Sequence, residues 1–257
     1  MLTPPEIARS LLAAGESKAR LPFGKMLLLA ILAGAYIALA GVGATAAAVT
    51  VESGSLAKLL SACVFPAGLS MVILAGSELF TGNCLMVMAL LERRITPAQL
   101  LRNWLTVYLG NAVGGAAVAA LAVYSHTASL FGDGLARSMV SIAESKAALG
   151  AGDAFLRGVL CNFLVCLAVW MAAASKRAEG KVIALFFPIL LFVLCGYEHC
   201  IANLYYLPAG AFAAAEYGVD TTLTLAGCLE NLAAVTLGNL VGGAALGVGY
   251  RFAYLKE

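Results

Sequence analysis

The chain has 257 residues, of which 62% are hydrophobic and only 12% are charged, and its mean hydropathy is +0.93. Soluble proteins carry about 25% charged residues, so the composition excludes a soluble protein and indicates an integral membrane protein in contact with a lipid bilayer. The net charge of +2, with no dense basic run, gives no reason to expect a nucleic-acid partner.

The first 22 residues alternate acidic, basic and apolar side chains without an unbroken apolar core, so we expect a surface amphipathic helix rather than a cleaved signal. Six apolar segments follow, and most reach the roughly 20 residues that cross a bilayer as a helix. They are residues 26–50, 59–91, 103–124, 155–175, 182–214 and 221–250. The sequence therefore predicts an all-α membrane protein with six transmembrane helices.

The basic residues predict how the chain is oriented. Six crossings leave Lys58, Arg137, Lys146 and Arg157 on one side. The other side receives twelve bases: Arg9, Lys18, Arg20, Lys25, Arg93, Arg94, Arg102, Lys176, Arg177, Lys181, Arg251 and Lys256. Because lysine and arginine gather in cytoplasmic loops, we expect both termini in the cytoplasm and the protein in the inner (plasma) membrane.

The frame Gly-x-Glu-x-x-x-x-Asn occurs twice, at residues 76–83 and 196–203, and each copy interrupts an apolar segment. A carboxylate at membrane depth is costly, so its presence in two matched frames indicates a polar site in which the second and fifth helices are broken. We expect new half-helices to begin near Asn83 and Asn203. Their free N–H groups and positive dipole ends would favour an anion near the midplane.

A second internal match has a shift of 128 residues and pairs residues 103–117 with residues 231–245. Two halves of three crossings each must run in opposite directions, since an odd number of crossings inverts the second copy. The sequence therefore predicts an inverted 3+3 repeat. Its halves are residues 23–124 and 153–250, within one transmembrane channel domain of residues 1–257.

The two octapeptides, the repeated frame N-x-x-x-V-x-L-G-N-x-x-G-G and the segment CNFLVCLAVW together resemble the formate/nitrite transporter family of pentameric anion channels. The resemblance extends from residue 1 to about residue 252. It implies an aquaporin-like fold with one pore in each protomer of a homopentamer. The implied substrates are small monovalent anions or their weak acids: formate, nitrite, hydrosulfide, acetate or lactate.

The same resemblance implies roles for individual residues. His199 is similar to the family's central pore histidine, Thr81 and Asn162 to its polar neighbours, and Lys146 to a vestibule lysine. The implied apolar constrictions are formed by Phe65, Leu69, Val165 and Phe192.

General chemistry is consistent with these roles. A bare anion in an apolar constriction costs tens of kcal/mol by the Born estimate, whereas transient protonation removes that barrier. Lys146 would concentrate the anion, and His199, the only histidine in a crossing, would exchange the proton. The alternatives are a packed neutral core histidine, and a surface lysine paired with Glu144 or Asp153.

Glu78 and Glu198 have two interpretations. They could bind a cation or relay protons, or they could hold the broken segments together by accepting hydrogen bonds, with Asn83 and Asn203 closing each break. The structural interpretation is favoured, because acidic rings would repel anions and buried carboxylates must be hydrogen-bonded.

Three classes of function remain open: a passive weak-acid anion channel, an obligatorily proton-coupled transporter of the same substrates, and a water or neutral-solute channel. The last is weakened because Asn-Pro-Ala is missing from the sequence. No motif of a protease, ATPase or nucleotide enzyme occurs, and the seven cysteines have no C-x-x-C spacing. We therefore expect no enzyme activity, no cofactor and no metal.

Overall fold

The computed structural model describes residues 1–255, and every regular element in this range is a helix. Lys256, one of the bases used to predict orientation, lies outside the described residues. In chain order the helices are α1 (Pro4–Ala19), α2 (Phe23–Ala46), α3 (Gly54–Val64), α4 (Pro66–Ala75), α5 (Phe80–Asn83), η1 (Cys84–Met86), α6 (Val87–Leu91), α7 (Pro97–Tyr124), η2 (Thr127–Ser129), α8 (Gly134–Ala147), α9 (Ala151–Ala173), α10 (Ala178–Leu194), α11 (Cys200–Tyr217) and α12 (Leu225–Tyr254).

Six crossings can be assigned to these helices. By length and composition, α2, the continuous pair α3–α4, α7, α9 and α12 are each able to span a bilayer. The short helices α5 and α6 continue the second crossing after a break, and α10 and α11 together make the fifth crossing. The all-helical fold with broken second and fifth crossings is confirmed.

Capping residues fix where the long helices begin. Pro97 occupies the first turn of α7, and the Thr96 hydroxyl accepts a hydrogen bond from the Gln99 N–H at 3.2 Å. The Thr224 hydroxyl caps α12 in the same way, accepting from the Gly227 N–H at 3.1 Å. The third and sixth crossings therefore have locally encoded starts.

The two breaks begin at glycines with left-handed backbone. Gly76 has a φ of 79° after α4, and Gly196 has a φ of 69° after α10. Glycine adopts such angles without the steric cost that a Cβ atom would bring. The helices resume at Phe80 and Cys200, three residues before the asparagines at which we expected them to begin.

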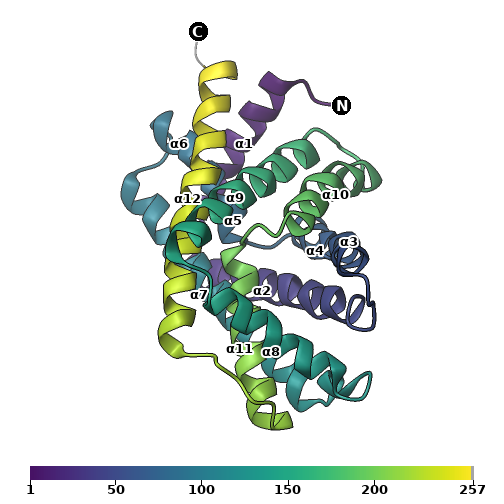
Figure 1. The fold of residues 1–257 in the computed structure, drawn as a ribbon. Coiled ribbons are helices and arrows are strands. Elements are labelled where there is room, and N and C mark those ends of the chain that lie inside the picture. Colours follow the sequence, from purple (N-terminus) through teal and green to yellow (C-terminus); the bar gives the residue numbers. More distant parts are fainter. Residues whose placement is uncertain (256–257) are drawn as a thin grey trace.

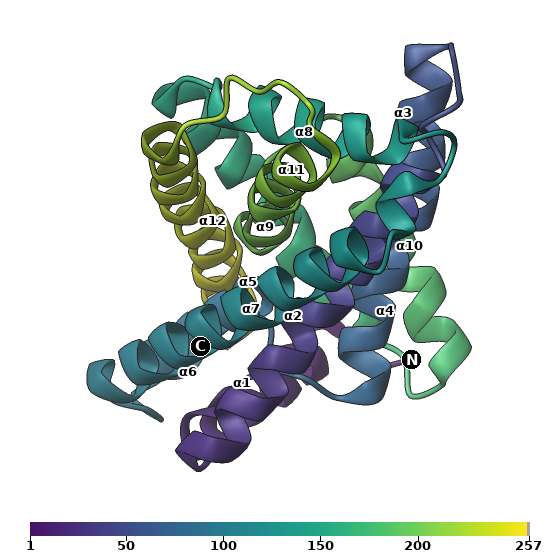
Figure 2. The ribbon, with the colours of Figure 1, turned by 90° about the horizontal axis from the view of Figure 1, so that it is seen from below.

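Glycines allow the first and third crossings of each half to approach closely. A Cβ atom on Gly114 of α7 would lie 2.0 Å from the Ile31 oxygen of α2. A Cβ atom on Gly242 of α12 would lie 2.1 Å from the Val159 oxygen of α9. The pairs α2–α7 and α9–α12 accordingly lie side by side (Figure 2). The two halves use equivalent contacts, as an inverted repeat requires.

The repeat also includes helices outside the membrane crossings. Residues 4–19, which form α1, fall on residues 132–147 with the same 128-residue shift, and α8 occupies residues 134–147. Figure 1 shows α1 at the end of the molecule that carries both termini, and α8 at the opposite end. Each end is therefore covered by one copy of the same helix.

Candidate functional site

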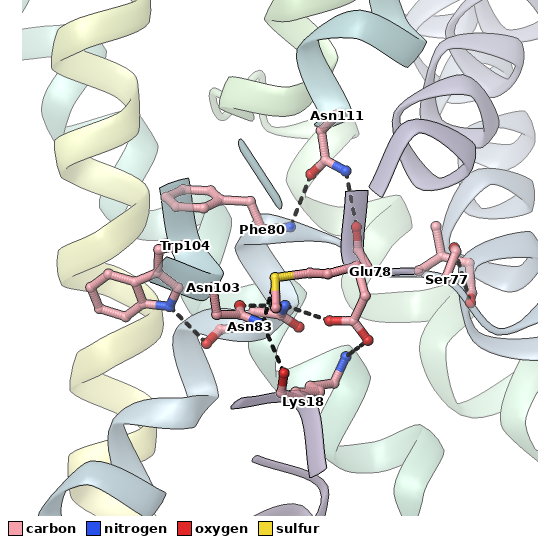
Figure 3. A network of polar contacts seen from close by, with 10 residues as sticks. Lys18, Ser77, Glu78, Phe80, Asn83, Asn103, Trp104 and Asn111 are labelled. Atoms are coloured by element: carbon pink, nitrogen blue, oxygen red, sulfur yellow. Dashed lines mark hydrogen bonds and ion pairs between the residues drawn. The ribbon is translucent and has the colours of Figure 1, made fainter. Parts of the chain in front are cut away.

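On the α1 side, a polar network holds the first break in place (Figure 3). The Lys18 ammonium donates to Glu78 Oε1 at 2.7 Å, and the Asn83 amide donates to Glu78 Oε2 at 2.7 Å. Asn83 also donates to Asn103 Oδ1 at 2.9 Å, and Trp104 Nε1 donates to the Asn83 backbone oxygen at 3.0 Å. The network thus connects α1, the break and α7.

On the α8 side, the second half makes the equivalent lysine, glutamate and asparagine contacts. Lys146 Nζ donates to both oxygens of Glu198, at 3.0 and 2.9 Å. The Asn203 amide donates to Glu198 Oε2 at 2.7 Å and to Asn231 Oδ1 at 2.8 Å. Asn231 in turn donates to the Lys146 backbone oxygen at 2.8 Å, as Asn103 does to the Lys18 backbone oxygen at 3.4 Å. Each buried carboxylate therefore has a lysine and an asparagine partner.

A second asparagine satisfies the non-helical backbone of the first break. Asn111 Oδ1 accepts from the Phe80 N–H at 3.0 Å, and its amide donates to the backbone oxygen of Glu78 at 2.9 Å (Figure 3). The amide also donates to the backbone oxygen of Ala30 at 2.7 Å. Unpaired peptide groups in a membrane interior cost several kcal/mol each. Asn111 removes that cost with one side chain.

Asn239 does the same at the second break. Its Oδ1 atom accepts from the Cys200 N–H at 2.9 Å, and its amide donates to the backbone oxygens of Glu198 at 2.9 Å and Gly158 at 2.8 Å. Both asparagines are fully buried. The first N–H group of each resumed helix is therefore bonded within the protein, and is not free for an anion as the sequence had led us to expect.

His199 lies at the start of α11 and connects the two halves. Its Nδ1 atom accepts a hydrogen bond from the Ala202 N–H at 3.1 Å, so this nitrogen carries no proton. The proton of the neutral imidazole is then on Nε2, which donates to Thr81 Oγ1 at 3.0 Å. His199 is only 3% exposed, and Thr81 is fully buried.

Apolar side chains surround the pore-facing side of His199. The remaining space there is about 10 Å³, which is room for about one water molecule. We call this the central constriction, and its lining residues are Ile37, Phe65, Leu69, Leu79, Val165, Ile189, Phe192 and His199. The Phe65 and Phe192 rings meet edge to face, with centroids 5.7 Å apart, and Phe192 stacks on His199 at 5.8 Å.

A cavity opens on either side of the central constriction. The α1-side vestibule has a volume of about 470 Å³, and its charged lining residues are Lys18, Lys25 and Glu78. The α8-side vestibule has a volume of about 360 Å³, and its charged lining residues are Lys58, Lys146, Arg157 and Glu198. Leu69 borders the first vestibule, whereas Phe65 and Phe192 border the second. Two cationic vestibules therefore meet at a narrow apolar passage.

Comparison with known proteins identifies this arrangement. Residues 5–253 match the family described as "Formate/nitrite transporter". A "Probable formate transporter" of Methanothermobacter thermautotrophicus is 39% identical over 99% of this chain and 98% of its own length. The chain belongs to the formate/nitrite transporter family. It is therefore a membrane transport protein and not an enzyme.

Solved structures of the family have the same fold. A structure titled "FNT family ion channel" is 32% identical, covers 96% of this chain and 98% of its own, and superposes with a TM-score of 0.86. A structure titled "Pentameric formate channel with formate bound" is 33% identical, covers 91% of this chain and 98% of its own, and has a TM-score of 0.80. The aquaporin-like fold of the formate/nitrite transporters is thus shown for this chain.

Within this formate/nitrite transporter fold, most of the residues chosen from the sequence gather around one passage. Phe65, Leu69, Val165, Phe192 and His199 line the central constriction together.

The remaining polar residues have positions behind that lining. Thr81 contacts His199 directly. Asn162 lies behind Thr81, where its amide donates to the Thr81 oxygen at 3.3 Å and to the Asn239 oxygen at 2.6 Å. Asn162 therefore positions Thr81 rather than facing the passage.

Lys146 has a different partner from those considered in the sequence. It pairs with Glu198, and not with Glu144 or Asp153. Glu144 instead accepts hydrogen bonds from the Thr222 N–H at 2.6 Å and from the Thr221 hydroxyl at 3.0 Å. These bonds lower the pKa of Glu144, which lies on α8 outside the crossings. Lys146 is consequently part of the vestibule wall.

Several residues of the site were missed in the sequence. Lys18 is the counterpart of Lys146, and Glu16-Ser17-Lys18-Ala19 repeats as Glu144-Ser145-Lys146-Ala147 with the 128-residue shift. Asn111 and Asn239, the clamps of the two breaks, also lie inside the repeat that was recognised in the sequence, but neither was given a role there.

Three residues of the central constriction, Leu79, Ile189 and Ile37, were also missed. The repeat shifts of 120 and 128 residues relate each of them to a constriction residue that was chosen. Leu79 stands where His199 stands in the second octapeptide, and Leu69 corresponds to Ile189 by the 120-residue shift. Ile37 falls on Val165 by the 128-residue shift. Aligning the two halves would have identified these residues.

Among residues 1–255, no group of three or more His, Cys, Asp or Glu side chains is placed to hold a metal ion. The cysteines are free thiols, and Cys84, Cys161, Cys166 and Cys200 are buried.

Proposed function

We propose that the protein is a channel for small monovalent anions that are conjugate bases of weak acids, such as formate, nitrite, hydrosulfide or a short carboxylate. Residues 1–257 would form a single channel domain, with one pore in each protomer of a homopentamer. The likeness to a structure titled a pentameric formate channel supports both the assembly and the class of substrate. We further propose that the protein lies in the inner (plasma) membrane, with both termini and the α1-side vestibule in the cytoplasm.

The observation that carries this proposal is the pairing of cationic vestibules with a dry constriction. The cations attract anions to both mouths, whereas a space of about 10 Å³ lined by apolar side chains cannot admit a hydrated ion. Desolvating a bare anion there would cost far more than the attraction of a nearby lysine returns. The species that crosses is therefore the neutral acid.

His199 is proposed to exchange the proton with the permeating anion through Nε2, the nitrogen that is bonded to Thr81. To become an imidazolium, His199 must take up a second proton on Nδ1 from solvent, which requires release of the Ala202 N–H from its 3.1 Å bond. The imidazolium can then give its Nε2 proton to an entering anion and take a proton back at Nε2 from the neutral acid beyond the constriction. Loss of a helix cap costs about 0.5–2 kcal/mol, which lowers the population of the protonated state. Thr81 orients Nε2, and Asn162 holds Thr81 from behind.

Glu78 and Glu198 are proposed to have structural roles. Each accepts hydrogen bonds from one lysine and one asparagine, so neither carboxylate is left to bind a cation. Each also lies two residues after the glycine at which a half-helix ends. Removing either carboxylate is expected to impair folding rather than selectivity.

A flux experiment in proteoliposomes tests the proposed function. Formate, nitrite, hydrosulfide and lactate uptake would be measured over a series of pH values and membrane potentials, together with the number of protons that enter for each anion. The protonation by His199 is transient, so the acid gives its proton back to His199 after the constriction and the net species moved is the anion. For a channel we therefore expect this ratio to fall below one as the pH rises. A ratio fixed at one would indicate an obligatorily proton-coupled transporter, and osmotic water flux without anion flux would indicate a water channel. Either result would overturn the proposal.

A further inference from the structure

The α8-side vestibule has more positive charge than its own ion pairs neutralise. Lys58, Lys146 and Arg157 line it, and Glu198 is the only carboxylate among its lining residues. Glu198 is already paired with Lys146 at 2.9 Å. The ion pairs found in residues 1–255 leave Lys58 and Arg157 without a carboxylate.

These charges are close enough to affect one another. Lys58 interacts electrostatically with Lys146, Glu198 and Arg157, and Arg157 also interacts with Glu198. Like charges gathered in one cavity repel each other unless a counter-ion is bound. Two uncompensated cations around one space therefore predict an anion between them.

The two cations are not required by the repeated scaffold. The 120-residue shift places Ala178 opposite Lys58, and the 128-residue shift places Leu29 opposite Arg157. The α1-side vestibule keeps its break, its lysine–glutamate pair and its asparagine clamp without these two bases. The repeated scaffold therefore does not explain why Lys58 and Arg157 are basic.

We propose that the α8-side vestibule is an anion-binding site in its own right, in which Lys58 and Arg157 hold a small oxyanion ahead of the constriction. The proposal rests on the proposed anion channel and deepens it. A cavity of about 360 Å³ is much larger than formate, so the site selects by charge rather than by shape. Two uncompensated cations bind a dianion more tightly than a monoanion.

This binding rule has a consequence for permeation. A monoanion such as formate becomes neutral when it takes up one proton, and can then cross the apolar passage. A dianion such as sulfate still carries a charge after taking up one proton. Sulfate therefore occupies the vestibule without crossing, and competes there with the permeant anion.

Reporter cysteines at repeat-equivalent serines test the proposal. Ser145 lines the α8-side vestibule and Ser17 lines the α1-side vestibule, and both are exposed. Ser145→Cys and Ser17→Cys would be made in a chain whose exposed or half-exposed thiols, Cys63, Cys195 and Cys228, are replaced by serine. The reaction rates with an anionic and a cationic thiol reagent would be measured on the channel in nanodiscs, where both vestibules are accessible.

The ratio of the anionic to the cationic rate reports the local potential. A unit charge at ~8 Å in water changes the local concentration of a monovalent ion roughly 2.5-fold, and so changes the ratio by about sixfold. We expect each of Lys58→Gln and Arg157→Gln to lower the Ser145→Cys ratio by about this factor and to leave the Ser17→Cys ratio unchanged. We also expect millimolar sulfate to slow the anionic reagent at Ser145→Cys more than sodium chloride of equal ionic strength does.

The outcomes separate this inference from the proposed function. An unchanged Ser145→Cys ratio, or sulfate protection that persists in the Lys58→Gln/Arg157→Gln double variant, overturns the binding site even if formate flux is normal. Sulfate protection that is lost in the double variant supports the site even if no weak acid is transported. Both substituted side chains are exposed, and gel filtration of each variant checks that the assembly is intact.

Discussion

Replacing Asn111 by leucine tests whether one side chain holds the first break. The leucine has a similar size but offers no hydrogen-bonding atoms. It removes the Asn111 Oδ1 atom that accepts from the Phe80 N–H at 3.0 Å, and the amide that donates to the backbone oxygen of Glu78 at 2.9 Å. Both peptide groups belong to the non-helical segment, whereas the third partner, the Ala30 oxygen, lies within α2. Only the first two groups depend on Asn111.

The expected loss follows from those two groups. A buried peptide group left unsatisfied costs about 1–3 kcal/mol, so Asn111→Leu should lower the free energy of unfolding by roughly 2–6 kcal/mol. For a chain of this length, each kcal/mol lost from the free energy of unfolding lowers the midpoint temperature of thermal unfolding by about 2–4 °C, which gives a fall of roughly 5–20 °C. Asn239→Leu removes the equivalent bonds at the second break and should cost a similar amount.

The assay is thermal unfolding of the purified protein in detergent. The matched control is Leu109→Ala, because Leu109 lies on the same helix as Asn111 and is 62% exposed. We expect this control to unfold within a few degrees of the unsubstituted protein. If Asn111→Leu unfolds at the same temperature as Leu109→Ala, the hydrogen bonds of the break do not depend on the clamp, and the account of both breaks is wrong.

Four further predictions concern the passage and the α8 end. His199→Asn keeps a good helix-capping residue, so we expect intact assembly but loss of the pH dependence of formate flux; an unchanged pH profile would remove His199 from proton exchange. Leu69→Ala should admit larger carboxylates in a flux panel and cost about 2–5 kcal/mol of stability, and an unmoved size limit would place the constriction elsewhere. Lys146→Ala should lower anion flux and weaken its saturation, and should lower the free energy of unfolding by about 3–5 kcal/mol because Glu198 loses its partner. Lys146→Arg should retain most of the flux. If the flux of Lys146→Ala equals that of the unsubstituted protein at two ionic strengths, this prediction is wrong. Bonds from the Thr222 N–H and two threonine hydroxyls lower the pKa of Glu144, so this residue stabilises the α11–α12 loop above its ordinary pKa, and the stabilisation is lost as the pH falls through the lowered value. Amide exchange in residues 221–223 should therefore quicken, beyond its intrinsic pH dependence, at acidic pH in the unsubstituted protein and not in Glu144→Gln.

The architecture could be predicted because it depends on patterns that persist over many residues. Apolar segments of bilayer length give the crossings, and the two octapeptides mark the breaks, since Gly76 and Gly196 take a conformation that other residues avoid. The apolar members of the constriction could be chosen only through the family resemblance, which implied Leu69, Val165 and Phe192; apolar composition alone does not distinguish them from other buried residues of the crossings.

Side-chain partners could not be predicted in the same way, because they depend on how distant segments meet. Lys146 has nearby acids at positions 144 and 153, yet it binds Glu198, 52 residues away. The N–H groups after each break were expected to be free. The first of them in each half, those of Phe80 and Cys200, instead donate to Asn111 and Asn239, which lie 31 and 39 residues further along the chain.

The comparison of the two halves separates residues that hold the fold from those that give the passage its chemistry. Lys18 and Lys146, like Asn111 and Asn239, make equivalent bonds in both halves, so each of these residues has a structural role that the repeat explains. His199 has Leu79 as its counterpart, and Thr81 has Ile201.

The bond between His199 and Thr81 therefore joins two positions at which the halves differ, one contributed by each half. A passage with leucine and isoleucine at both pairs of positions would be symmetric and would have no group able to exchange a proton. The proposed proton exchange would consequently depend on broken symmetry. Lys58 and Arg157, which also lack counterparts, extend that asymmetry to one vestibule.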